Sequence, residues 1–121
     1  MPPHKPIISF GLDSMSLMCD NMLMEYEIRT TNIFDKWLAG IRDKTTRARI
    51  ITRFDHIHNG NFGDNKSLGS GLFELRFFFG AGFRIYYTIQ GERVVFLLTG
   101  GDKSSQSKDI KKAKAVMAEL E

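Results

Sequence analysis

The sequence predicts an α+β fold in which helices pack on a small antiparallel sheet. Three apolar runs between residues 72 and 99 are separated by glycine-containing turns of hairpin length, which is typical of a three-stranded meander. Apolar side chains instead recur at helical spacing between residues 33 and 57, and again after residue 107. These observations predict the order β-α-α-β-β-β-α, with two N-terminal helices before the meander and a C-terminal helix after it.

The elements before the meander are bounded by residues that favour helix starts and stops. A strand over residues 25–29 precedes an N-cap at Thr31-Asn32, from which a short helix runs to Gly40. A second helix covers about residues 46–58, and a glycine-rich loop covers residues 61–71. The apolar stripe of the second helix is Ile50, Ile51, Phe54 and Ile57. The stripe of the final helix, which starts near Ser107, is Ile110, Ala113, Met117 and Leu120.

The meander is expected to contain the strands Leu72–Phe79, Phe83–Ile89 and Arg93–Thr99. Side chains alternate between the faces of a strand, so one face is apolar and aromatic and belongs to the core. A three-residue turn would pair Phe79 with Phe83, and Arg76 with Tyr86. The opposite face, expected to be open, carries Glu74, Arg76, Phe78, Arg84, Tyr86 and Thr88.

Two guanidinium groups and a phenol on one open face form a candidate anion-binding surface. The planar guanidinium donates two hydrogen bonds to two phosphate oxygens at once. The alternative is an ordinary solvated sheet, on which Arg76 pairs with Glu74 or Glu92 and Tyr86 is a cross-strand packing partner.

Length and charge indicate one domain with a polyanionic partner. The chain has 121 residues and a formal net charge of +3, and residues 65–121 hold nine Lys or Arg against six acidic residues. This excess lies in the half that holds the meander, which suits nucleic acid. Residues 1–24 show no clear periodicity, so we expect an N-terminal extension outside the core fold and a domain at residues 25–121. The alternative is an added edge strand at Ile7–Phe10.

The N-terminal segment and the single cysteine favour a cytoplasmic setting. Cys19 cannot form an internal disulfide, which fits a reducing compartment. No apolar run approaches the roughly 18 residues needed to span a bilayer. Asp13 and Asp20 interrupt what would be the apolar region of a signal peptide.

Two other polar sets have simple interpretations. His56 and His58 would point about 200° apart on a helix, and no cysteine or acid cluster joins them, so we expect no metal and no cofactor. Arg47, Arg49 and Arg53 are expected on a solvated helix face, with contact to ribosomal RNA as the alternative.

Several short motifs resemble one known superfamily. They lie in the glycine-rich loop, in the first two strands of the meander and around the start of the final helix. They are Asn61-Phe62-Gly63-Asp64 with Lys66, Glu74-Leu75-Arg76, Gly80-Ala81-Gly82-Phe83-Arg84-Ile85-Tyr86-Tyr87, Gly100-Gly101-Asp102-Lys103-Ser104 and Lys108-Asp109-Ile110. Together with the element order, they make residues 25–120 similar to the RelE/ParE superfamily of type II toxin–antitoxin modules. Within it, the motifs look closer to the HigB-like, phage-derived addiction module killer proteins.

The resemblance implies a toxin that arrests growth by cleaving mRNA without a metal, usually on the ribosome. A cognate antitoxin, expected to be of the helix-turn-helix type, would neutralise it. Members of the ParE branch instead inhibit DNA gyrase, and the shared fold does not decide between these activities. A third alternative is a catalytically silent RNA-binding relative, because the tyrosine or histidine that nuclease members often place in the C-terminal segment is missing after Tyr87.

Metal-independent RNA cleavage uses the ribose 2′-hydroxyl to attack the adjacent phosphorus, so the protein must position the strand, stabilise charge and move protons. The resemblance places Arg76 and Arg84 on the phosphate, and with Lys103 they form the predicted catalytic set. The predicted RNA-binding residues are Lys66, Tyr86 and Lys108, where Tyr86 would stack on a base or orient a proton carrier. The candidates for proton transfer in the C-terminal segment are Asp102, Lys103, Lys108 and Asp109.

Overall fold

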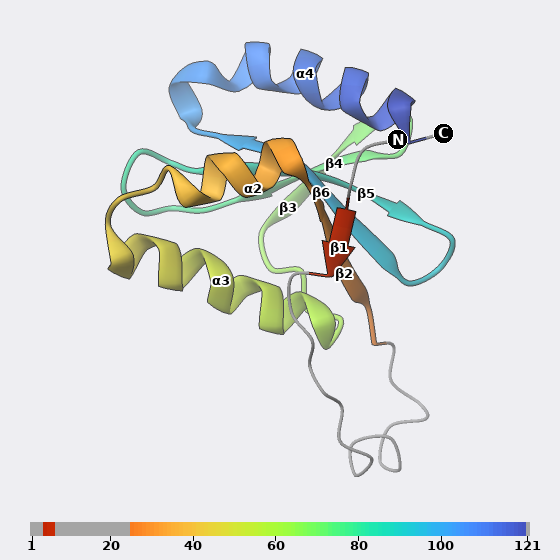
Figure 1. The fold of residues 1–121 in the computed structure, drawn as a ribbon, viewed down its shortest axis with the longest axis horizontal. Helices are drawn as coiled ribbons and strands as arrows, with labels where there is room; N and C mark the ends of the chain where they lie inside the picture. The colour runs from red at the N-terminus through yellow and green to blue at the C-terminus, as the bar shows by residue number, and fades with distance from the viewer. Residues whose placement is uncertain (1–3, 7–24, 121) are drawn as a thin grey trace, which may run out of the picture.

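Six strands form one mixed sheet in the computed structural model, which describes residues 4–6 and 25–120 (Figure 1). The spatial order of the strands is β1-β2-β6-β5-β4-β3. The elements are β1 (His4–Pro6), β2 (Glu27–Thr31), α2 (Asn32–Ala39), α3 (Lys44–His58), β3 (Asn65–Gly69), β4 (Leu72–Arg76), β5 (Arg84–Gln90), β6 (Val94–Gly101), the 3₁₀ turn η1 (Lys103–Ser105) and α4 (Gln106–Glu119).

The helices lie on both sides of the sheet, as Figure 1 shows. On one side, α2 and α3 bury Phe34, Ile50, Phe54 and Ile57 against Leu75, Ile85, Tyr87, Val95 and Leu97 of the sheet. On the other side, α4 buries Ala113 and Val116 against Leu72, Tyr86, Phe96 and Leu98. The sheet is therefore the middle layer of three, and each of its faces has its own apolar core. We call the core under α2 and α3 the first core and the core under α4 the second core.

The sheet is not purely antiparallel, which corrects the prediction. β2 pairs in parallel with β6, whereas the neighbouring pairs from β6 to β3 are antiparallel. Residues 65–69, predicted to belong to a loop, form the edge strand β3. Four of the five residues of β3 are exposed, so it lacks the apolar alternation that identifies a half-buried strand.

The first meander turn is longer than predicted. β4 ends at Arg76, and the connection to β5 covers residues 77–83. Arg76 consequently pairs with Arg84, and Glu74 pairs with Tyr86, so the predicted pairing of Arg76 with Tyr86 is wrong by two residues. A shift of two preserves the faces, because side chains alternate with period two. The predicted core face is confirmed, with Leu75, Ile85 and Tyr87 in the first core.

The prediction that the opposite sheet face is open is wrong. The helix α4 covers it, and Glu74, Tyr86 and Thr88 are 1%, 0% and 7% exposed. The predicted stripe of α4 does face the sheet. Ala113 is buried and Ile110, Met117 and Leu120 pack against the second core, which Val116 also joins.

Short polar contacts fix the starts of α2 and α3. The Thr31 hydroxyl accepts a hydrogen bond from the backbone N–H of Phe34 and donates one to the carbonyl of Leu98, so the predicted cap also ties α2 to β6. Asp43 caps α3, which begins two residues before the predicted start. On α3 the predicted stripe is buried except for Ile51, which is 37% exposed.

The N-terminal segment is described only at residues 4–6, which pair antiparallel with β2 at the sheet edge. The alternative edge strand at Ile7–Phe10 lies outside the described residues, and the boundary between extension and domain stays a prediction. Within residues 25–120, no helix is both long enough and apolar enough to cross a membrane.

Candidate functional site

A cationic hollow of about 360 Å³ lies where β5 begins and β6 ends. Its lining consists of Phe77, Phe78 and residues 80–82 from the β4–β5 connection, together with Arg84 and Lys103. Gly82 lies between the two cations, since a Cβ atom there would be 3.4 Å from Cβ of Lys103 and 3.7 Å from Nη1 of Arg84. Gly82 also has a φ of +75°, which favours glycine. We call this feature the Arg84–Lys103 hollow.

Arg84 is held from below by the buried carboxylate of Glu74. Nε of Arg84 lies 3.9 Å from Oε2 of Glu74, and the two side chains are only 11% and 1% exposed. Nη1 of Arg84 donates to the carbonyls of Gly82 and Phe83 at 3.1 and 3.3 Å. From α4, Gln106 donates to Oε2 of Glu74 at 2.7 Å. Two hydrogen bonds from Nη1 and the nearby carboxylate therefore restrain the guanidinium in the lining of the hollow, although its buried Nε makes no hydrogen bond to any described residue.

Arg76 does not line the hollow, although it pairs with Arg84 across the strands. Its Nε and Nη2 donate to the two carboxylate oxygens of Asp64 at 3.1 and 3.3 Å. Both side chains of this pair are about one-third exposed, at 35% and 32%. Arg76 is thus engaged by an acidic partner that the sequence motif contains, and its predicted catalytic role stays a prediction.

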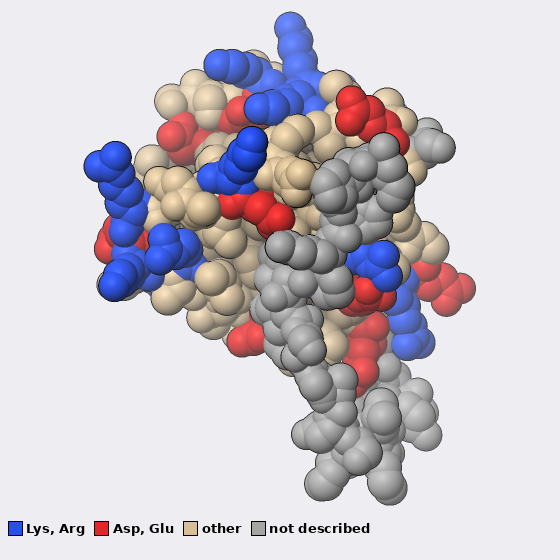
Figure 2. All heavy atoms as spheres, in the orientation of Figure 1, with Lys and Arg blue, Asp and Glu red and all other residues tan. Residues whose placement is uncertain are grey.

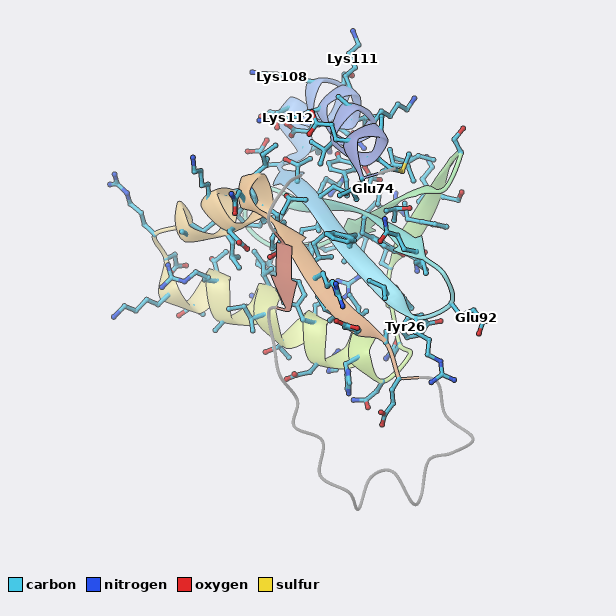
Figure 3. The ribbon with its side chains drawn as sticks, turned by 45° about the vertical axis from the view of Figure 1, so that its right-hand side comes forward. Tyr26, Glu74, Glu92, Lys108, Lys111 and Lys112 are labelled. Carbon is cyan, nitrogen blue, oxygen red and sulfur yellow. The ribbon has the colours of Figure 1, made fainter. Side chains whose placement is uncertain are left out.

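The three predicted RNA-binding residues occupy different environments. Lys66 is exposed on β3 opposite Glu74, at the sheet edge beyond Arg76. Lys108 is exposed on α4 and projects away from the sheet, whereas Glu74 lies between the sheet and α4 (Figure 3). Tyr86 is buried beneath α4 and is not available to stack on a base in this conformation. None of the three lines the hollow.

Tyr86 belongs instead to a buried polar cluster. Burial, together with the neighbouring Glu74 carboxylate, raises the pKa of its hydroxyl above the usual value for tyrosine. The phenol therefore stays neutral at physiological pH. The other members are Glu74 and Gln106. Sequence reasoning placed Glu74 on this face as a possible partner of Arg76, whereas in the structure it faces Arg84. Sequence reasoning missed Gln106, for which no local pattern gave a signal.

The two acidic candidates for proton transfer are occupied by the start of the final helix. The Asp102 carboxylate accepts hydrogen bonds from the backbone N–H and hydroxyl of Ser104, and the hydroxyl bond is the main reason its pKa is lowered. Asp109 accepts a hydrogen bond from the Ser105 hydroxyl. Both carboxylates serve the local fold, and neither lines the hollow.

The three arginines of α3 make tertiary contacts and do not form a simple solvated face. Arg53 donates to the carbonyls of Phe62, Asp64 and Arg76, which ties α3 to the loop before β3 and to the end of β4. Arg47 donates to the carbonyl of Ile41, and the guanidinium of Arg49 lies 4.0 Å from the ring centroid of Phe79. The interpretation of these arginines as a solvated face is wrong for Arg53. Burial also lowers the pKa of its guanidinium.

The histidine pair shows no metal-binding arrangement among the described residues. Nδ1 of His58 lies 2.8 Å from the carbonyl of Tyr26. Within residues 4–6 and 25–120, no three His, Cys, Asp or Glu side chains are grouped so that they could hold an ion.

The wider surface adds scattered positive charge. Figure 2 shows Lys and Arg side chains over α4 and over the α2–α3 connection, with acidic side chains between them. Such a surface attracts polyanions weakly, while the Arg84–Lys103 hollow offers a fixed point of contact for a phosphate.

Comparison with known proteins places this chain in a family. Residues 36–119 match the profile described as phage-derived protein Gp49-like (DUF891). The chain belongs to this family, which is associated with addiction-module toxins. A relative from Haemophilus influenzae, described as an uncharacterized protein, is 46% identical over 97 residues, covering 80% of this chain and 98% of the relative. No solved structure matches.

Proposed function

We propose that this chain is a RelE/ParE-type, HigB-like toxin of a type II toxin–antitoxin module, and that it arrests growth by cleaving mRNA in the cytoplasm. A cognate antitoxin of the helix-turn-helix type is its partner. Membership of the Gp49-like family supports the toxin assignment. The observation that carries the RNA assignment is the Arg84–Lys103 hollow, where a fixed guanidinium and an exposed ammonium group converge.

In this proposal the hollow holds the phosphate next to the attacked bond. Nη1 of Arg84 is bonded to two backbone carbonyls and Nε is buried beside Glu74, so Nη2 is the guanidinium nitrogen assigned to a phosphoryl oxygen. The same contacts keep the guanidinium in place before the substrate arrives. Charge that develops on the phosphorane is then stabilised without reorganisation of the site. The rest of the rate enhancement comes from positioning, because the site holds the 2′-hydroxyl in line with the leaving 5′-oxygen.

Lys103 is the lining residue able to carry a proton. Arginine stays protonated in proteins, and the other lining side chains are phenylalanine, alanine and glycine. Lys103 is therefore assigned two roles: it stabilises charge on the phosphorane and donates a proton to the leaving 5′-oxygen. The proton of the attacking 2′-hydroxyl passes to solvent water, because the described lining residues offer no carboxylate or histidine to accept it. Asp102 and Asp109 are not assigned a proton-transfer role, because they hold the start of the final helix.

The test is controlled expression of the toxin in a bacterial host, with growth measured and transcript ends mapped by primer extension. Lys103 is exposed, so Lys103→Ala should fold. Removing the ammonium group, which stabilises charge in the transition state, should slow cleavage about 100-fold. Lys103→Arg keeps the charge but removes the transferable proton, so it should retain RNA binding and lose cleavage. Lys44→Ala, exposed in the first turn of α3, is the matched control.

Three outcomes would overturn parts of the proposal. Full cleavage by folded Lys103→Ala would refute the site. Growth arrest with intact transcripts and inhibited supercoiling by purified gyrase would replace the nuclease function with a gyrase-directed one. RNA binding without any cleavage, with or without ribosomes, would identify a silent RNA-binding relative.

A further inference from the structure

Phe78 is the one large apolar side chain among the described residues that is mostly exposed, at 81%. Its aromatic neighbours in the same connection are packed. Phe77 is 3% exposed in the first core, Phe79 lies under the guanidinium of Arg49, and Phe83 contacts Trp37 edge-on. A single exposed apolar residue is common on protein surfaces, so its position has to carry the argument.

The connection that displays Phe78 is braced on both sides. The backbone N–H of Phe77 donates to the carbonyl of Phe83 at 3.0 Å, and that of Gly82 donates to the carbonyl of Phe79 at 3.2 Å. The backbone N–H of Lys103 donates to the carbonyl of Ala81 at 3.4 Å. Phe78 is therefore presented by a loop that needs little further ordering when a ligand binds.

The residues around Phe78 indicate which class of ligand its ring would bind. Its ring lines the same hollow as Arg84 and Lys103, and the other exposed residues there are small. Among the described residues, Ile51 is the only other large apolar side chain that is exposed, so no continuous apolar patch around Phe78 marks a protein-binding surface. A ring beside a restrained guanidinium and an exposed lysine is instead the arrangement with which proteins bind single-stranded nucleic acid, because the ring stacks on a base while the cations hold phosphate.

We propose that Phe78 is a stacking platform for an unpaired nucleobase of the RNA strand whose phosphate occupies the Arg84–Lys103 hollow. This inference rests on the proposed function and specifies its substrate as a single-stranded segment. Bases inside a duplex already stack on each other, so they would not reach the ring. The residue acts on binding and carries no proton.

The experiment measures fluorescence anisotropy of a short single-stranded RNA in which 2′-fluoro groups replace every 2′-hydroxyl, so that cleavage cannot occur. Phe78→Ala should weaken binding about 5- to 150-fold, the range observed when a stacking aromatic is removed. An abasic strand with the same phosphates should bind wild type and Phe78→Ala equally. Phe78→Trp should retain binding of the normal strand. Ile51→Ala removes the other partly exposed large apolar residue and should change nothing.

Lys103→Ala provides the complementary result, because it should weaken the normal and the abasic strands alike. Equal weakening of both strands by Phe78→Ala, or no weakening of either, would overturn the stacking role. Base-dependent binding combined with intact transcripts in cells would support the stacking role and refute cleavage. A third outcome would refute both proposals: the wild-type protein binds neither strand, and Phe78→Ala nevertheless abolishes growth arrest. Phe78 would then be identified as a protein contact.

Discussion

Glu74→Gln removes the negative charge that faces Arg84 while preserving the shape of the side chain. Glu74 is 1% exposed and Arg84 is 11% exposed, so water screens this pair poorly. At the observed separation of 3.9 Å, attraction at the effective dielectric constant suited to protein sites is about 4 kcal/mol. Losing one partner of a buried pair leaves the other charge uncompensated, which is what makes such losses costly.

Part of this loss is offset in the variant. The glutamine oxygen can still accept from Gln106, and Nη1 of Arg84 keeps the carbonyls of Gly82 and Phe83. We therefore expect Glu74→Gln to lower the free energy of unfolding by about 2–4 kcal/mol. The matched control is Glu27→Gln, because Glu27 and Arg29 form an exposed ion pair and should contribute less than about 1 kcal/mol.

Urea unfolding at neutral pH measures this difference, with the fluorescence of Trp37, the single tryptophan, as the probe. Adding Arg84→Met tests the cause, since removing both charges leaves no unpaired buried ion. The double variant should show a coupling energy of about 1–3 kcal/mol between the two positions. The reasoning fails if Glu74→Gln is as mild as Glu27→Gln, or if the two substitutions are additive.

Two further predictions concern the attachment of α3 and the first core. Arg53→Met removes hydrogen bonds to three backbone carbonyls and should lower the free energy of unfolding by about 2–4 kcal/mol. Arg49→Met, which loses a stacking contact alone, should cost no more than about 1 kcal/mol by the same urea assay. Burial raises the pKa of Tyr87 to about 12, while tyrosine in the unfolded chain titrates near pH 10. The stability from this neutral phenol is therefore full below about pH 10 and is lost as pH rises towards 12. Tyr87→Phe should flatten that decline in unfolding curves recorded at stepped pH, and an unchanged slope would contradict the assignment.

Patterns within short stretches of sequence were sufficient to predict the three helices and the core face of β4 and β5. The helices α2, α3 and α4 follow from apolar spacing and caps, and Thr31 acts as the cap that its position predicts. The aromatic core face of β4 and β5 was identified by alternation, and it survived an error of two residues in register because alternation has period two. The strand β3 was missed because its polar, exposed residues carry no such pattern.

What covers a surface depends on contacts that are distant in sequence. The apolar stripe of α4 predicts that the helix packs on something, but it does not say on which face of the sheet. The choice of face determines the environments of two residues. Tyr86 is buried by α4, and Glu74 accepts a hydrogen bond from Gln106 of α4. The candidate site therefore moved from the middle of the sheet face to its end, where α4 begins and the connection of residues 77–83 leaves a hollow.

The ion pairs explain why this smaller site still suits a phosphate. Among the described residues, Asp64 pairs with Arg76 and Glu74 pairs with Arg84, while no ion pair joins Lys103. Glu74 compensates the charge of Arg84 from beneath, so the hollow presents a net charge close to that of Lys103 alone. One phosphodiester group carries one negative charge, which matches this balance. The buried acid thus makes two adjacent cations tolerable in the folded protein, and it leaves the outward side of the hollow positive.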